Sequence, residues 1–294
     1  MLRVHHRTRY RYQHSASQGY NLAWLTPRAM PGQQCIETSL RVEPLPRGLG
    51  SRSDGYGNTL HYFEIHKAHN RLNVSSEATV RRWPAPDLSA ITTPWEQLRS
   101  ADWVAAPGDL PPREFSYPSP LIDSHPEITA YAAQSFTPGR GLGDALLAYN
   151  RGLHADFHYQ PGATSVETPV AEVWESRSGV CQDFAHLAIA GLRGLGLAAA
   201  YVSGYVLTRD PSDKIPNQGG DASHAWYAVY VPALGWLQLD PTNNLVVGDA
   251  HIVLAIARDY SDVPPVKGLC YGGGTHKLEV SVSVEVIAED AHEH

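Results

Sequence analysis

The fold of this chain is organised around the stretch RSGVCQDFAH, residues 177–186. From Phe184 onward, apolar or small residues recur at every third or fourth position, namely 184, 187, 188, 191, 192 and 195. This spacing predicts a helix with one stripe facing a core. Cys181 lies three residues before Phe184 and therefore on the stripe, whereas His186 falls off it. The sequence thus predicts a cysteine in the first turn of a helix.

A thiol in a first helical turn is close to unpaired backbone N–H groups, and the helix dipole there favours an anion. A helix terminus stabilises an anion by at most about 2 kcal/mol, which is less than a reactive thiolate needs, so a second positive group is expected. The candidate is His224 in DASHAW, residues 221–226. Asp240 in WLQLDPT, residues 236–242, is the candidate partner of that histidine.

Both candidates lie in segments with the alternation of β-strands. Residues 224–231 alternate, residues 232–235 are typical of a turn, and residues 236–240 alternate again. In an antiparallel pair with even residues opposite even ones, His224 and Asp240 share a face as direct or diagonal neighbours. A register shifted by one residue would separate them.

These three residue types predict acyl-transfer chemistry. Cys181 as thiolate attacks an acyl carbon, His224 takes and returns the proton, and Asp240 fixes the tautomer of the imidazole. Backbone N–H groups at the helix start, including that of Cys181, face the developing oxyanion. Further candidates for an oxyanion donor or a substrate groove are His158, Tyr159, Gln182 and Trp226. For His158 and Tyr159, a packed strand with satisfied polar tips is the alternative.

The residues around these positions resemble the core of bacterial transglutaminase-like proteins, which are often described as cysteine proteases. The resemblance runs in order over residues 150–245 through GVCQDFA, LRGLGL, YVSGY, SHAW, GW and DPT, and residues 251–274 are similar to the same bacterial group. It implies the catalytic set Cys181, His224 and Asp240, and an N-terminal β-domain. One departure is Ala198-Ala199-Ala200, where the group often carries Pro-Ala-Arg, so a contact made by that basic side chain is in doubt.

The chain is expected to have an α+β fold: an N-terminal antiparallel β-domain, and a papain-like or transglutaminase-like core whose nucleophile helix packs on an antiparallel sheet. The expected parts are a β-rich domain at 1–83, a Pro-rich connector at 84–122, the catalytic core at 123–250 and a C-terminal extension at 251–294. Trp95 and Trp103 are expected to pack the connector on the body.

Within these parts, alternation predicts strands at residues 3–12, 35–42, 59–65 and 72–82, with the arginines of the first strand on a solvated face. Residues 277–286 also alternate and are expected to return to the N-terminal sheet. Helices are expected near 126–136, 142–156 and 170–176. Residues 209–221 are polar enough for a mobile flap beside His224, and residues 289–294 for a disordered end.

Composition limits the partners. The 294 residues carry a formal net charge of −7, which argues against a nucleic-acid partner, and no apolar run is long enough for a membrane span. Residues 1–13 lack the apolar stretch of a signal peptide, so a cytoplasmic location is expected. Three cysteines are too few for a disulfide framework, and no metal-ligand spacing lies near Cys181, so neither a metal nor another cofactor is expected.

The predicted function is a thiol-dependent enzyme that acts on a peptide or protein amide by hydrolysis or by transfer to an amine, as a peptidase, amidase or transglutaminase. A deamidase or peptide cyclase with the same site is one alternative. A noncatalytic peptide-binding module is another, although a binding role would not need all three side chains. The sequence leaves the oligomeric state open.

Overall fold

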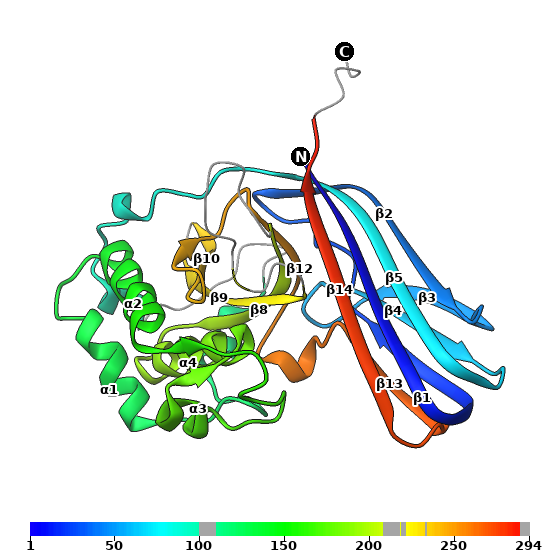
Figure 1. The fold of residues 1–294 in the computed structure, drawn as a ribbon. Coiled ribbons are helices and arrows are strands. Elements are labelled where there is room, and N and C mark those ends of the chain that lie inside the picture. The colour runs from blue at the N-terminus through cyan, green and yellow to red at the C-terminus, as the bar shows by residue number, and fades with distance from the viewer. Residues whose placement is uncertain (100–109, 208–217, 219–221, 233, 289–294) are drawn as a thin grey trace, which may run out of the picture.

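The computed structural model describes residues 1–99, 110–207, 218, 222–232 and 234–288. It combines two antiparallel sheets with a group of helices on one side of the molecule, which confirms the expected α+β class (Figure 1). The expected flap at 209–221, apart from Gln218, and the expected disordered end at 289–294 lie outside the described residues. Among the residues that the structure describes, no helix is long and apolar enough to cross a membrane.

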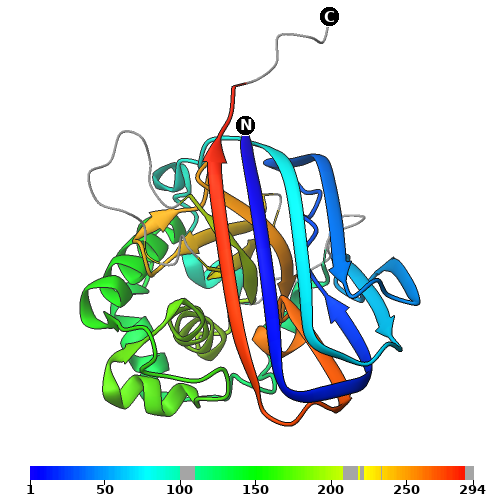
Figure 2. The ribbon, with the colours of Figure 1, turned by 45° about the vertical axis from the view of Figure 1, so that its right-hand side comes forward.

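The N-terminal sheet is built on one long strand, β1 (Leu2–Ala23). The first half of β1 pairs with β5 on one side and β14 on the other, and its second half pairs with β4 and β13. Figure 2 shows β14, in red, alongside β1, in dark blue, so the C-terminal strand returns to the N-terminal sheet as expected. The other strands are β2 (Gln33–Glu43), β3 (Gly48–Ser53), β4 (Thr59–Ile65), β5 (His69–Arg82), β13 (Val266–Gly272) and β14 (His276–Val286).

The two faces of β1 carry different types of residue, because successive side chains of a strand point to opposite faces. Leu2 and Val4 are buried against the rest of the body, while Arg3 and Arg7 are exposed. On the outer face Arg9 and Arg11 lie within 3.7 and 3.6 Å of Glu279 on β14. The arginines therefore belong to a solvated face of mixed charge, as expected.

The second sheet has five strands in the order β11-β10-β9-β8-β12, and every neighbouring pair for which a register is defined is antiparallel. Its strands are β8 (Ala199–Val206), β9 (His224–Val231), β10 (Gly235–Asp240), β11 (Leu245–Val246) and β12 (His251–Ala257). Side chains from β8 and β12 pack against the inner face of the N-terminal sheet, which joins the two sheets through one apolar core.

Four α-helices pack beside this sheet: α1 (Pro126–Ser135), α2 (Leu142–Asp156), α3 (Val170–Ser176) and α4 (Cys181–Gly194). α4 contacts β8 and β9 on one side and α1, α2 and α3 on the others. The first three helices agree with the expected ranges to within one residue. The sheet, α4 and the outer helices share one large apolar core, which holds the start of α4 in place.

The expectation of a single apolar stripe on α4 was wrong, because residues 182–193 are all buried. His186 is 2% exposed, and its ring lies 5.3 Å from that of Tyr201. Arg193 is buried too, and its guanidinium donates to the carbonyl oxygen of Ala199 at 2.9 and 3.1 Å. The helix is enclosed by a sheet on one side and by helices on the others, so its polar residues are buried and hydrogen-bonded instead of solvated.

Residues 198–200, where the bacterial group that the sequence resembles often carries Pro-Ala-Arg, are three buried alanines at and just before the start of β8. Ala200 is fully buried and lies on the face of the sheet that packs against the connector. Arg193 supplies a buried cation close to this point from the neighbouring helix. The connector itself packs on the body through Trp95, which is 6% exposed and donates to the Thr137 carbonyl at 3.0 Å, whereas Trp103 lies outside the described residues.

Candidate active site

Cys181 is the first residue of α4, and the start of that helix is anchored on both sides of the cysteine. The Asp183 carboxylate accepts a hydrogen bond from the backbone N–H of Val180 at 2.7 Å and another from the Thr164 hydroxyl at 2.6 Å. The preceding residues Ser178–Gly179 form β7, which pairs with β6 (His158–Tyr159). Cys181 itself is partly exposed. The partly exposed cysteine therefore lies on a helix start that is fixed by its neighbours.

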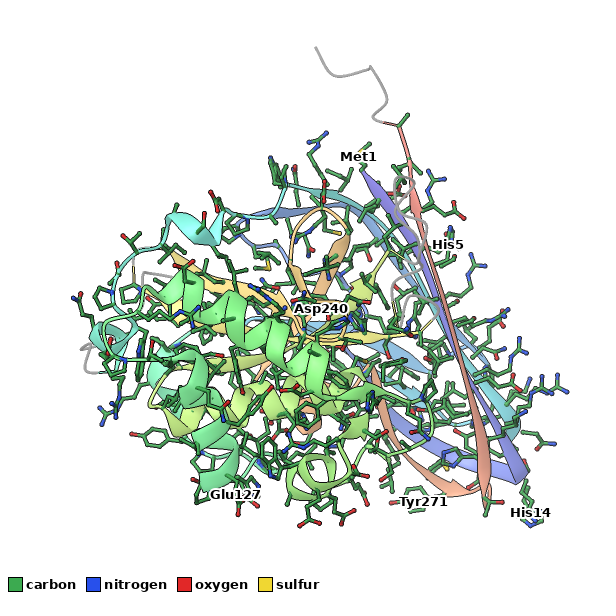
Figure 3. All side chains as sticks on the ribbon, turned by 60° about the vertical axis from the view of Figure 1, so that its left-hand side comes forward. Met1, His5, His14, Glu127, Asp240 and Tyr271 are labelled. Carbon is green, nitrogen blue, oxygen red and sulfur yellow. The ribbon has the colours of Figure 1, made fainter. Side chains whose placement is uncertain are left out.

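His224 and Asp240 lie on adjacent strands with the predicted register. Trp236 is opposite Tyr230 and Leu239 is opposite Tyr227, so even residues face even ones. Continued by one residue, this register puts Asp240 opposite Trp226 and makes His224 its diagonal neighbour. The His224 Nε2 lies 2.8 Å from the Asp240 Oδ2, and both side chains are fully buried. The pairing on which the sequence prediction depends is thus present. Figure 3 shows Asp240 inside the body, apart from His5 and His14 on the N-terminal sheet.

The Cys181 side chain lies close enough to the His224 ring to affect its pKa. Burial lowers the pKa of His224, but the Asp240 carboxylate and the Cys181 side chain raise it by more, to about 10. No hydrogen bond of regular geometry joins Nδ1 to a described residue. Catalytic hydrogen bonds are often loose without substrate, so this proximity and the free Nδ1 fit a sulfur–imidazole pair.

Asp240 is a carboxylate in this site. Burial raises its pKa, but the neighbouring His224 and His251 imidazoles lower it by more, so the pKa lies well below its ordinary value. An ionised carboxylate only accepts hydrogen bonds, so the His224 Nε2 carries a proton and donates a hydrogen bond to the Asp240 Oδ2. The Nδ1 of His224 is then the atom that can exchange a proton with Cys181.

The structure adds two residues to the site that the sequence did not indicate. The Asn243 side chain donates to the Asp240 Oδ2 at 2.8 Å, and its backbone N–H donates to Oδ1 at 3.2 Å. The His251 Nε2 lies 3.2 Å from the same Oδ2. Asn243 follows Asp240 by three residues, a spacing typical of an Asp side chain that caps a turn, and this signal was available in the sequence. His251 offers no such signal.

The four candidates for an oxyanion donor or a groove are in different places. His158 is exposed and Tyr159 is partly buried, both on the short strand β6. The Gln182 amide donates to the Val166 carbonyl at 3.0 Å and so holds a loop that precedes Cys181 in the chain. Trp226 is fully buried with its ring 5.7 Å from that of His224, and its indole N–H donates to Gln238 at 2.9 Å. It therefore lies within the core beside the histidine, not on an open groove.

Two further observations concern the surroundings of Cys181, His224 and Asp240. A cavity of about 790 Å³ is lined by Arg82, Trp83 and Trp236 among others, but not by Cys181, His224 or Asp240. Within the part of the chain that the structure describes, no group of three or more His, Cys, Asp or Glu side chains has the arrangement of a metal site.

Comparisons with known proteins agree with this architecture. Residues 2–81 match the family model of the bacterial transglutaminase-like N-terminal region, and residues 130–241 match the transglutaminase-like superfamily. The chain is 41% identical to an uncharacterized protein of Mycobacterium tuberculosis over 97% of this chain and 92% of the relative. An uncharacterized protein of Mycobacterium leprae is 31% identical over 98% of this chain and 99% of its own length.

Among solved structures, the fold is similar to that of "a Putative Cysteine Protease" from Cytophaga hutchinsonii. The TM-score is 0.75 at 23% sequence identity, and the match covers 98% of this chain and 91% of that one. At this identity the likeness concerns the fold alone. The family matches over both parts of the chain and the mycobacterial relative that is 41% identical establish the family. The chain belongs to the transglutaminase-like superfamily, in the bacterial group that carries the N-terminal region.

Proposed function

We propose that this protein is a cysteine-dependent acyl-transfer enzyme that acts on the amide bonds of peptides or proteins. The observation that carries the proposal is the buried His224–Asp240 pair, 2.8 Å apart, beside a partly exposed cysteine at a helix start. A structural cysteine would need neither partner. Membership of a superfamily with thiol-dependent enzymes supports the same conclusion. The expected cytoplasmic location, and the absence of nucleic-acid and membrane partners, stay predictions.

The first half of the reaction forms a thioester. The Cys181 proton passes to the Nδ1 of His224, and the sulfur attacks the amide carbon, whose oxygen becomes an oxyanion near the backbone N–H groups of the first turn of α4. When the C–N bond breaks, the imidazolium gives its proton to the leaving amine. Asp240 stays ionised throughout and stabilises the charged form of His224.

The second half releases the acyl group. Water, or a second amine, gives a proton to His224 and attacks the thioester carbon, and Cys181 regains its proton as it leaves. With water the result is hydrolysis, and with an amine it is crosslinking or ligation. Hydrolysis of a side-chain amide is deamidation by the same steps. The choice depends on how well the acyl-enzyme is shielded from water.

Intact-protein mass spectrometry with a library of peptide amides tests the proposal directly. The wild type should gain an acyl mass, and Cys181→Ala should not. His224→Ala should slow acylation by about 10²–10⁴-fold, the usual contribution of a general acid–base group, and Asp240→Ala should slow it less. Cys35→Ser is the matched control and should leave the rate unchanged. An added amine separates transfer from hydrolysis.

Two outcomes would contradict the proposal. An acyl adduct that persists in Cys181→Ala would exclude this cysteine as the nucleophile. Peptide binding without any adduct, together with iodoacetamide labelling at pH 6 no faster than that of free cysteine, would favour a noncatalytic peptide-binding module.

A further inference from the structure

Asp240 holds a second imidazole, that of His251. The His251 Nε2 lies 3.2 Å from the Asp240 Oδ2, the same oxygen that accepts from the His224 Nε2 at 2.8 Å. His251 is the first residue of β12, whereas Asp240 ends β10, and two other strands lie between these two in the sheet. The chain after Asp240 therefore crosses the strand ends and returns His251 to the carboxylate.

Packing fixes the ring of His251 in this position. The residue is 1% exposed, and its ring lies 5.2 Å from that of Trp226 in an edge-on arrangement. Trp226 also lies 5.7 Å from the His224 ring, so one indole borders both imidazoles. The backbone N–H of His251 donates to the Gly248 carbonyl at 3.2 Å. The ring therefore has little freedom to leave Asp240.

The charged and titratable groups around His251 favour its neutral form. Burial lowers its pKa, the Asp240 carboxylate opposes this, and the His224 imidazole and the Arg82 guanidinium lower the pKa further. Asp249 faces Arg82, and Tyr227 faces Asp240. A neutral imidazole can donate to an ionised carboxylate only from the nitrogen that carries its proton. The proton of His251 is therefore on Nε2.

We propose that His251 is a positioning residue for the triad: its Nε2–H holds the Asp240 carboxylate in place and takes up part of its hydrogen-bonding capacity, which limits the pull of that carboxylate on His224. This inference rests on the proposed function. Its consequence is that His251 sets the upper pH limit of the Cys181–His224 pair. Without the donor, the charge of Asp240 would act more strongly on His224, and the imidazolium would persist to higher pH.

The test is the pH profile of Cys181 alkylation by iodoacetamide in a protein with Cys35→Ser and Cys270→Ser, measured from pH 5 to about pH 12 because the pKa of His224 is raised to about 10. No natural substrate is needed. In His251→Phe, which keeps an aromatic ring against Trp226 but lacks the donor, the alkaline inflection should rise by about one pH unit. In His251→Gln, whose amide offers a donor near the same place, the inflection should stay close to that of the parent.

A profile of His251→Phe that superimposes on the parent, or an equal shift in His251→Gln, would overturn the inference. If the parent cysteine itself is no more reactive than free cysteine at pH 6, the proposed function fails instead, so the two failures are distinguishable. A second measurement needs no substitution at all: long-range ¹⁵N–¹H spectra of the histidine-labelled protein should place the His251 proton on Nε2 at pH 7. A proton on Nδ1 would overturn the inference even if the variants do not fold.

Discussion

At Asp183 a single carboxylate oxygen ties two parts of the chain to the start of α4, the helix that begins with Cys181. Its Oδ2 accepts from the Val180 backbone at 2.7 Å and from the Thr164 hydroxyl at 2.6 Å. Burial raises the pKa of Asp183, and these two hydrogen bonds oppose the rise. Burying this carboxylate next to Cys181 costs desolvation free energy. Its two hydrogen bonds offset that cost and hold the loop that contains Thr164 against the start of α4.

Asp183→Ala should lower the free energy of unfolding by about 1–2 kcal/mol, the usual cost of losing a helix-capping side chain. Thr164→Val is the matched control: it removes one of the two hydrogen bonds, leaves the cap of Val180 intact and should cost less. Because both substitutions act on the same oxygen, the double variant should cost less than the sum of the two. Urea-unfolding midpoints measure all three. Additive effects would contradict the shared role of this carboxylate.

At the scale of elements, the β9–β10 hairpin is the part of the site that the sequence predicted best. Alternation over residues 224–231 and 236–240 gives the face of each side chain, and a short turn gives the register. These two facts are local, so one sequence is enough to bring His224 to Asp240. The helix that begins at Cys181 was equally readable, because its period extends over three turns.

Contacts that depend on the path of a loop could not be predicted from the sequence. His251 reaches Asp240 across the ends of two intervening strands, and nothing in local spacing encodes that crossing. The strands β8 and β12 are buried on both faces and therefore lack alternation. The burial of His186 could not be predicted either, because this residue lies off the apolar stripe of α4 and is covered by elements that are distant in the sequence.

Gly204 on β8 lies in a tightly packed part of this sheet. A Cβ at this position would lie 2.2 Å from the Ile252 carbonyl oxygen on β12 and 2.4 Å from the Trp226 ring. Gly204→Ala should therefore lower the free energy of unfolding by about 2–3 kcal/mol, since overpacking forces a backbone or a buried ring to move. Gly48→Ala on β3 is the control, because its Cβ would have no neighbour within 4 Å, and it should be close to neutral. Thermal unfolding of both variants measures the two changes in stability. Equal destabilisation by Gly204→Ala and Gly48→Ala would contradict the packing argument.

At the scale of the whole molecule, the N-terminal sheet and the five-stranded sheet are joined by one apolar layer. Leu2 and Val4 of β1 and Val284 of β14 pack in the same cluster as Tyr205 of β8 and Ile252 of β12. The backbone N–H of Ile287 donates to the Met1 carbonyl at 3.0 Å, so Met1 is held by the residue that follows β14. The sheet is therefore a structural part of the body that carries the site.

His6 lies in this layer as a buried histidine. It is 2% exposed, its Nε2 lies 2.7 Å from the Thr8 hydroxyl, and its ring lies 5.6 Å from that of Tyr205. Burial lowers the pKa of His6 to about 4. Between pH 4 and about 6.5 the unfolded chain consequently binds a proton here that the folded chain does not, and stability falls as the pH falls through that window.

The decrease in the free energy of unfolding at acid pH should therefore depend on His6. From pH 7 to pH 5 this histidine should remove about 2 kcal/mol from the free energy of unfolding, and His6→Gln, which does not titrate, should show a correspondingly smaller decrease. His186 and His251 also have lowered pKa values, so the wild type loses more than this in total, but their contribution is common to both proteins. Urea unfolding at the two pH values measures the difference. If the free energy of unfolding decreases equally in the wild type and in His6→Gln, the apolar layer between the sheets does not bury a neutral His6.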